Sequence, residues 1–121
     1  MSRTVLTVDD SKSIRDMVAF TLEAAGYRVV GAENGAEGLT KLAASPVDLI
    51  ITDLNMPVMN GFDFIRAVRR TPSGAGVPIL MLTTESDPGK KAEGKDAGAT
   101  GWINKPFDAE KLVAVTKKLA G

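Results

Sequence analysis

The sequence predicts an α/β domain in which helices cover both faces of a parallel sheet. Five short runs, most of them rich in Val, Ile or Leu, alternate with five longer segments that have helical spacing. Parallel strands need right-handed crossovers, and these crossovers place helices on both faces. A chain of 121 residues has room for one such domain and not for two. We therefore expect one doubly wound domain over residues 1–121, with five strands, five helices and no output domain.

The five runs are the predicted strands. In chain order they are Thr4–Val8, Arg28–Ala32, Leu49–Thr52, Ile79–Thr83 and Gly101–Asn104. The first, third and fourth are almost continuously apolar, which is typical of strands buried on both faces. The second and fifth are weaker. We therefore expect the second and fifth strands at the edges of the sheet.

The helices are predicted from apolar spacing and from their end residues. Glycine suits the position after a helix, proline cannot continue one, and Asp or Asn caps a helix start. The expected helices are 14–25, ended by Gly26; a segment from Asn34 to Ser45; 61–70; 88–97, capped by Asp87; and a last helix capped by Asp108. The fourth is polar and contains Gly94, so we expect it to be the least stable helix.

Composition excludes several kinds of chemistry. The chain has no Cys and no His, so it lacks a thiolate nucleophile, a Ser-His pair and an imidazole metal ligand. Fifteen basic and fifteen acidic residues cancel, and we expect no direct binding of nucleic acid. The sequence has neither a stretch of about 20 apolar residues nor a signal-like start. We expect a cytoplasmic protein that does not bind membranes and whose metal ligands are oxygens.

Polar side chains end or directly follow four of the predicted strands. They are Asp9, Asp10, Asp53, Thr83 and Lys105. Ligands of open α/β sheets bind beyond the carboxyl ends of the strands, so these side chains are expected to converge. Clustered carboxylates repel one another, and a cation would relieve that repulsion. Among hard cations we favour Mg²⁺ over Ca²⁺, because the carboxylates are few enough to leave coordination positions on the ion for water and phosphate.

A magnesium ion beside a free carboxylate and a lysine is suited to phosphoryl transfer. Asp53 would attack the phosphorus atom and form an aspartyl phosphate, which is a recognised covalent intermediate. The hydroxyl of Thr83 would donate to one phosphoryl oxygen, and Lys105 would contact another. The sequence thus favours Asp53 as the nucleophile.

Four motifs carry a resemblance to a known family: V-D-D, D-L-N-M-P-x-x-N-G, M-L-T-T and K-P-F. The chain resembles the receiver domain of two-component response regulators over essentially its whole length, and its size is similar to that of CheY-type chemotaxis regulators. The resemblance implies a flavodoxin-like fold with strand order 2-1-3-4-5. It also implies Mg²⁺ as cofactor, a histidine kinase as phosphodonor, and a reader of the phosphorylated state such as the flagellar motor switch.

The resemblance further assigns a role to individual residues on the acidic side of the site. Asp53 would be the phosphoryl acceptor. Asp10, Asp53 and the backbone carbonyl of Asn55 would bind Mg²⁺, and Asp9 would act mainly through water. The protein would be a signalling receiver that catalyses its own phosphorylation and dephosphorylation, and we expect it to be a monomer.

On the other side of the site, the resemblance makes Thr83 and Trp102 a switch pair. Lys105 would contact the phosphoryl group, and the peptide bond between Lys105 and Pro106 would be cis. Such bonds are uncommon in folded chains, so this expectation depends on the resemblance alone.

Several alternatives stay open at this point. The run Asp9-Asp10-Ser11 could be no more than a helix cap, and Trp102 could be an ordinary packing residue. A phosphate sink would use the same acceptor, Asp53, without any effector. A small phosphotransferase or phosphatase would also use it, although such enzymes need a substrate pocket for which the chain has few spare residues.

Overall fold

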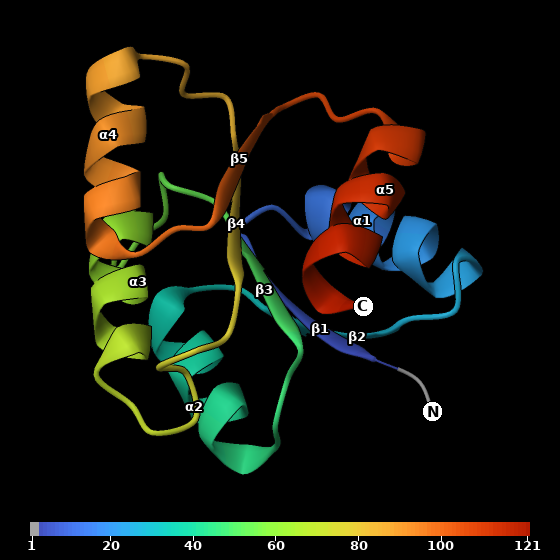
Figure 1. Cartoon of the computed structure of the whole chain (residues 1–121), viewed down its shortest axis with the longest axis horizontal. Coiled ribbons are helices and arrows are strands. Elements are labelled where there is room, and N and C mark those ends of the chain that lie inside the picture. The colour runs from blue at the N-terminus through green and yellow to red at the C-terminus, as the bar shows by residue number, and fades with distance from the viewer. Residues whose placement is uncertain (1–2) are drawn as a thin grey trace.

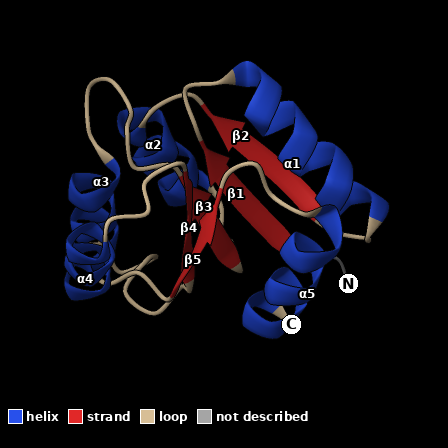
Figure 2. Cartoon of the chain, turned by 90° about the horizontal axis from the view of Figure 1, so that it is seen from above, coloured by secondary structure: helices blue, strands red, loops and turns tan. Residues whose placement is uncertain are grey.

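The computed structural model describes residues 3–121 and contains a five-stranded parallel sheet between two layers of helices (Figure 1, Figure 2). The strands are β1 (Thr4–Val8), β2 (Arg28–Ala32), β3 (Leu49–Thr52), β4 (Ile79–Thr83) and β5 (Gly101–Asn104). Their order is β2-β1-β3-β4-β5, and all neighbours are parallel. The predicted fold class, strand bounds and strand order are confirmed. The first two residues of the predicted domain 1–121 lie outside the described residues.

Five helices connect and cover the strands. They are α1 (Lys12–Ala24), α2 (Gly35–Ala44), α3 (Gly61–Arg69), α4 (Pro88–Ala97) and α5 (Ala109–Ala120). Helices α1 and α5 lie on one face of the sheet, and α2, α3 and α4 lie on the other (Figure 2). Each helix begins after a polar side chain that accepts a backbone N–H bond. No helix within residues 3–121 is both long enough and apolar enough to cross a membrane.

The core is divided by the sheet because successive strand residues point to opposite faces. In β1, Leu6 packs toward α2 and α3, whereas Val5 packs toward α1 and α5. The central strands β3 and β4 are buried along their whole length, while most residues of β2 and β5 are partly exposed or exposed. The structure therefore confirms that the second and fifth strands are the edges.

The register brings the carboxyl ends of the strands to one edge of the sheet. Val8 of β1 pairs with Thr52 of β3, and Thr83 of β4 pairs with Asn104 of β5. Residues that directly follow these strands must therefore emerge close together. This edge positions the candidate site.

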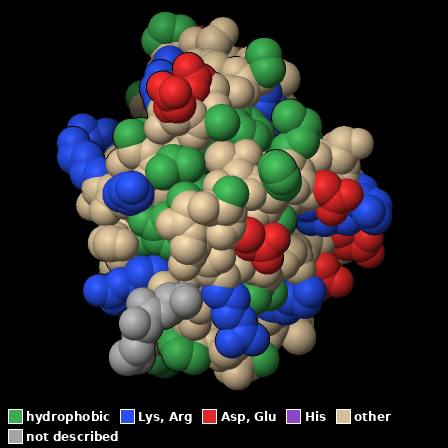
Figure 3. All heavy atoms as spheres, turned by 90° about the vertical axis from the view of Figure 1, so that its right-hand side faces the viewer, with side chains coloured by type: hydrophobic (Ala, Val, Ile, Leu, Met, Phe, Trp, Pro, Cys, Tyr) green, Lys and Arg blue, Asp and Glu red, His purple; other side chains and the backbone are tan. Residues whose placement is uncertain are grey.

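The two flanks of the sheet present different surfaces. On the α1–α5 flank, apolar side chains reach the surface (Figure 3), and Met17 and Phe20 of α1 are 52% and 71% exposed. On the other flank, a cavity between α4 and β5 is bordered by Lys91 and Lys95 beside Trp102. Exposed apolar side chains thus mark the α1–α5 flank, and two lysines border the cavity on the other.

Candidate functional site

Three carboxylates meet at the carboxyl edge of the sheet. Asp9 and Asp10 follow β1, Asp53 follows β3, and one oxygen of each lies within 4.8 Å of the others. Asp9 and Asp53 are buried, with 2% and 7% exposure, whereas Asp10 is exposed. The structure therefore brings together the carboxylates that the sequence placed at separate strand ends.

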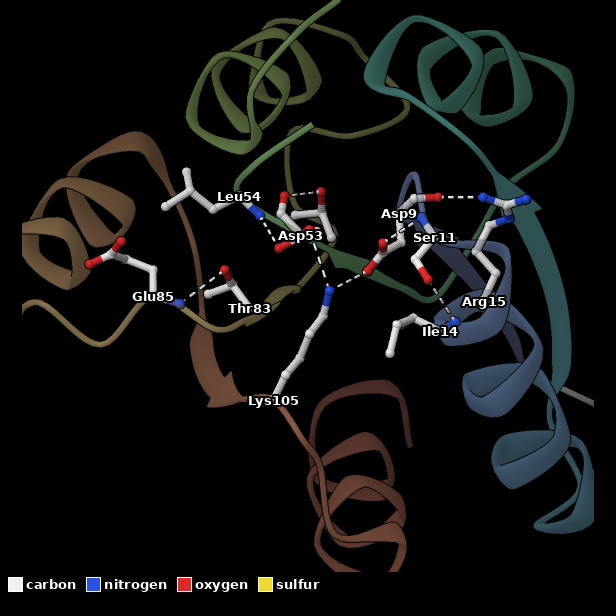
Figure 4. Close-up of polar contacts among 10 residues, drawn as sticks. Asp9, Ser11, Ile14, Arg15, Asp53, Leu54, Thr83, Glu85 and Lys105 are labelled. Atoms are coloured by element: carbon white, nitrogen blue, oxygen red, sulfur yellow. Dashed lines mark hydrogen bonds and ion pairs between the residues drawn. The ribbon is translucent and has the colours of Figure 1, made fainter. Parts of the chain in front are cut away.

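Lys105 lies between the two buried carboxylates (Figure 4). Its Nζ donates to Oδ2 of Asp9 at 2.8 Å and lies 3.3 Å from Oδ2 of Asp53. Burial would lower the pKa of Lys105, but the bond to Asp9 and the negative charge of Asp53 raise it above its ordinary value. Lys105 therefore stays an ammonium ion. The peptide bond between Lys105 and Pro106 is cis.

Asp9 is the most constrained of the three carboxylates. Its Oδ1 accepts the backbone N–H of Ser11 at 2.9 Å, and its Oδ2 accepts Lys105. Burial nevertheless raises the pKa of Asp9, because desolvation outweighs these bonds. The cap of α1 is Ser11, whose Oγ accepts the N–H of Ile14 at 3.3 Å. Capping is thus done by Ser11, and neither aspartate is needed for it.

Asp53 is fixed by a tight loop that follows β3. Its Oδ1 accepts the backbone N–H of Leu54 at 2.7 Å, and the N–H of Gly61 bonds the Leu54 carbonyl at 2.7 Å. A Cβ at position 61 would lie 2.4 Å from the carbonyl oxygen of Asp53, so only glycine fits there. Asn55, whose carbonyl the resemblance assigns to the metal, lies in this same loop.

Thr83 and Trp102 meet at one residue, Glu85. The Thr83 hydroxyl accepts the backbone N–H of Glu85 at 3.3 Å (Figure 4). The Glu85 carbonyl in turn accepts the indole Nε1–H of Trp102 at 3.0 Å and the side-chain amide of Asn104 at 2.8 Å. The backbone of Glu85 therefore links the end of β4 to β5, a link that the sequence did not indicate.

Gly94 has a role that the sequence did not reveal. A Cβ at this position in α4 would lie 3.0 Å from Cζ3 of Trp102 and 3.4 Å from Cε1 of Phe62. The glycine lets the indole approach the helix closely. Sequence patterns assign Gly94 only a destabilising effect, because they do not show what lies against the helix.

Two further residues of the site region, Val58 and Arg15, were not indicated by any sequence pattern. Val58, in the loop before α3, has a φ of 72° and is 80% exposed, an unfavourable conformation for a β-branched residue. Arg15 of α1 donates from Nη1 to the Asp9 carbonyl at 2.6 Å. Neither has a sequence signal, because both follow from how the loops close.

The donor set fits a hard divalent cation. The three clustered side chains offer only oxygens as ligands. The backbone N–H of Leu54 bonds Oδ1 of Asp53, so Oδ2 of Asp53 and the carboxylate of Asp10 are the oxygens that remain for a metal ion. Asp9 is already bonded by Ser11 and Lys105, which is compatible with a role through water. The residues present therefore suit Mg²⁺ better than a metal that prefers nitrogen or sulfur.

Comparison with known proteins gives consistent results. The sequence model described as the response regulator receiver domain matches residues 5–117. The DNA-binding dual master transcriptional regulator RpaA of Synechocystis is 37% identical over 115 residues, which are 95% of this chain and 48% of RpaA. The chain spans about half the length of the curated relatives it matches.

Solved structures agree along the whole chain. Chemotaxis protein CheY4 of Vibrio cholerae is 51% identical, with a TM-score of 0.95, and the match covers 98% of this chain and 99% of CheY4. The receiver domain of sensor histidine kinase PA1611 from Pseudomonas aeruginosa is 26% identical with a TM-score of 0.92, covering 100% of this chain and 99% of that domain. That structure was described with a magnesium ion coordinated in its active site cleft.

Proposed function

Because the chain belongs to the response regulator receiver family of two-component signalling, we propose that it accepts a phosphoryl group from a histidine kinase on Asp53 and signals by a change in conformation. The observation that supports this most directly is the position of the Asp53 carboxylate, which lies 3.3 Å from the ammonium of Lys105 and within 4.8 Å of oxygens of Asp9 and Asp10. A lone structural aspartate would not need a lysine and two further carboxylates around it.

In the proposed transfer, an oxygen of the Asp53 carboxylate attacks the phosphorus atom. A P–O bond to Asp53 forms, the P–N bond of the donor phosphohistidine breaks, and the leaving imidazole takes a proton from solvent. Mg²⁺, held by Asp10, Asp53 and the Asn55 carbonyl with Asp9 acting through water, would neutralise charge on the phosphoryl oxygens. The receiver would also catalyse its own dephosphorylation, in which water attacks the phosphorus atom, the P–O bond to Asp53 breaks, and inorganic phosphate leaves.

Lys105 and Thr83 would recognise the new phosphoryl group. The ammonium of Lys105 already lies 3.3 Å from Asp53, so a small movement away from Asp9 would bring it to a phosphoryl oxygen. The hydroxyl of Thr83 accepts a hydrogen bond from the backbone N–H of Glu85, and its own O–H would donate a hydrogen bond to a phosphoryl oxygen. Charge-assisted bonds of this kind contribute about 1.5–3 kcal/mol each.

The change would pass through Glu85 to Trp102 and α4. Any shift of Thr83 alters the Glu85 backbone, whose carbonyl holds Trp102. Moving a two-state equilibrium from 1:99 to 99:1 needs about 5.5 kcal/mol, and the two bonds from Lys105 and Thr83 would together supply about 3–6 kcal/mol. The switch pair is therefore Thr83 and Trp102, with Glu85 between them.

A downstream partner would read the basic face formed by α4, β5 and α5. A cavity of about 270 Å³ there is lined by Lys91, Lys95 and Trp102, and an adjoining one includes Lys111 and Lys118. We propose chemotaxis as the pathway and a flagellar motor switch as the partner, since CheY4 is similar over the full length of both chains. The proposal includes a cytoplasmic monomer that does not bind nucleic acid.

The acceptor assignment is tested with acetyl [³²P]phosphate and Mg²⁺. Asp53→Asn should lose the hydroxylamine-sensitive label, because the amide cannot form an acyl phosphate. The matched control is Asp63→Asn on the exposed surface of α3, which should label like the unaltered protein. Full labelling of Asp53→Asn would rule out the assignment.

A second experiment separates a reader of the phosphorylated state from a phosphate sink. The protein would be immobilised with and without beryllofluoride, a mimic of the phosphoryl group, and exposed to the purified motor-switch protein of the same organism. Binding that increases with beryllofluoride supports an effector role. Equal or no binding in both conditions would leave the sink as the better description of the downstream role.

A further inference from the structure

We propose that Arg15 is a positioning residue for the divalent cation. By bonding the carbonyl of Asp9, its guanidinium would hold the backbone from which the carboxylate of Asp10 projects toward the metal. This inference builds on the proposed function, because it concerns the same cation site. It assigns a role to a side chain that touches neither the phosphoryl group nor the metal.

The three carboxylates differ in what fixes their positions. The Asp9 carboxylate is bonded by the N–H of Ser11 and by Lys105, and that of Asp53 is bonded by the N–H of Leu54. The carboxylate of Asp10, in contrast, accepts no hydrogen bond and forms no ion pair within residues 3–121. Its place within 4.8 Å of the other two therefore depends on its backbone.

Arg15 acts on that backbone directly. Its Nη1 donates to the Asp9 carbonyl oxygen at 2.6 Å (Figure 4). This carbonyl belongs to the peptide unit that joins Asp9 to Asp10, and the unit is planar. Fixing the direction of the carbonyl therefore fixes the N–Cα bond of Asp10 and limits where its side chain can point.

The side chain of Arg15 reaches the carbonyl along a defined path. Its stem crosses the edge strand β2 at Gly31, where a Cβ would lie 3.6 Å from Cδ of Arg15. The N–H of Asp9 is bonded to the Ala32 carbonyl of the same strand at 3.1 Å. Asp9 is thus held from β2 on its nitrogen side and by Arg15 on its carbonyl side.

Charge repulsion and positioning predict opposite changes in cation binding when Arg15 is replaced. A guanidinium near the carboxylates repels a divalent cation, so removing its charge should tighten binding if charge dominated. If positioning dominates, removing the side chain should weaken binding, because outer partners that orient ligands contribute strongly to metal affinity. The direction of the change separates the two explanations.

The test is a titration of the unphosphorylated protein with MgCl₂, followed by NMR shifts of the backbone amides. Arg15→Met should raise the Kd for Mg²⁺ about tenfold, the low end for residues that orient metal ligands. Arg15→Lys keeps the charge and much of the stem, and should raise it about threefold, as expected for the loss of part of one hydrogen bond. Arg28→Met, which removes an exposed arginine from the other end of β2, should leave it unchanged.

The outcomes are distinct. Unchanged or tighter Mg²⁺ binding by Arg15→Met would overturn the positioning role, as would an equal weakening by Arg28→Met. If Arg15→Met fails to fold, Arg15→Lys carries the test, and an unaltered Kd in that variant overturns the role. Failure of the proposed function has a different signature, because the unaltered protein itself would then show no saturable Mg²⁺ binding at the carboxylates.

Discussion

Helices α3 and α4 lie side by side on the same face of the sheet, yet they are held there by different interactions (Figure 1). α3 buries four large apolar side chains, Phe62, Phe64, Ile65 and Val68. α4 buries only Gly94 and Ala97 among its ten residues. Hydrophobic burial therefore anchors α3, and α4 depends on its contacts with neighbours at a few points.

Besides the packing of Gly94 and Ala97 and an ion pair between Glu93 and Arg66, α4 is held by polar bonds at its two ends. Before its first turn, the Glu85 carbonyl is held by Trp102 and Asn104. At its last turn, Nη2 of Arg69 donates to the Gly98 carbonyl at 2.7 Å, while Nη1 bonds the carbonyls of Gly74 and Val77. A helix secured in this way can change position when one end contact changes, without exposing a core.

The functional consequence follows from what each helix carries. α3 is joined to Asp53 through the tight loop at Gly61, so its apolar anchor keeps the acceptor in place. α4 follows Thr83 and Glu85, where the proposed switch begins. Strong burial beside the chemistry and weak burial beside the reading surface is the arrangement that a switch requires.

The largest expected effect tests the anchor of α3. Phe64→Ala should lower the free energy of unfolding by about 3–5 kcal/mol, because Phe64 is fully buried against α2 and the sheet. Lys91→Ala on the exposed side of α4 should change it by less than about 0.5 kcal/mol. Urea unfolding followed by circular dichroism measures both. Equal changes in the two variants would contradict the difference between the helices.

A smaller effect is expected at the contact between α4 and Trp102. Gly94→Ala should destabilise the protein by about 1–3 kcal/mol, because the added methyl group would overlap the indole. The protein has one tryptophan, so its fluorescence reports the displacement directly. The control is Gly89→Ala in the same helix, where the nearest atom is 3.6 Å away and the usual gain of about 0.5–1 kcal/mol is expected. A stabilising effect of Gly94→Ala would show that the indole does not limit the helix.

The entry to α3 contains one unfavourable conformation, at Val58. Val58→Asn should stabilise the protein by about 1 kcal/mol, because asparagine tolerates a positive φ and valine does not. Val58→Thr keeps the β-branch while removing apolar surface, and should give no gain. Thermal unfolding compares the two. If threonine stabilises as much as asparagine, exposure of an apolar side chain and not backbone strain explains the effect.

The pH dependence of stability gives the smallest effect and separates the acidic edge from the ends of α4. Burial raises the pKa of Asp9 in the folded protein. Its favourable contribution to the free energy of unfolding is therefore complete at a pH below its ordinary pKa of 3.8, and is lost as the pH rises through the raised pKa. In metal-free buffer, Asp9→Asn should therefore flatten the fall in stability above about pH 4. An unaltered slope in Asp9→Asn would contradict the burial effect.

Much of the fold, and the identity of the side chains that form the site, could be predicted from the sequence. Apolar runs marked the strands, and caps such as Asn34 and Asp108 marked helix starts, because these signals are local. Convergence of Asp10, Asp53 and Lys105 followed from topology, since parallel strands joined by right-handed crossovers place their carboxyl ends at one edge. The sequence alone therefore determined the architecture and the side chains at its functional edge.

The tertiary structure decided how those side chains are held and which helix is free to respond. Arg15 meets Asp9, Trp102 meets Glu85, and Arg69 meets Gly98 across 6, 17 and 29 positions of the chain. None of these pairs has a periodicity or a motif, and each bond ends on a backbone carbonyl, which every residue has. Backbone acceptors carry no sequence signature, so only the folded path of the chain shows which side chain reaches which carbonyl.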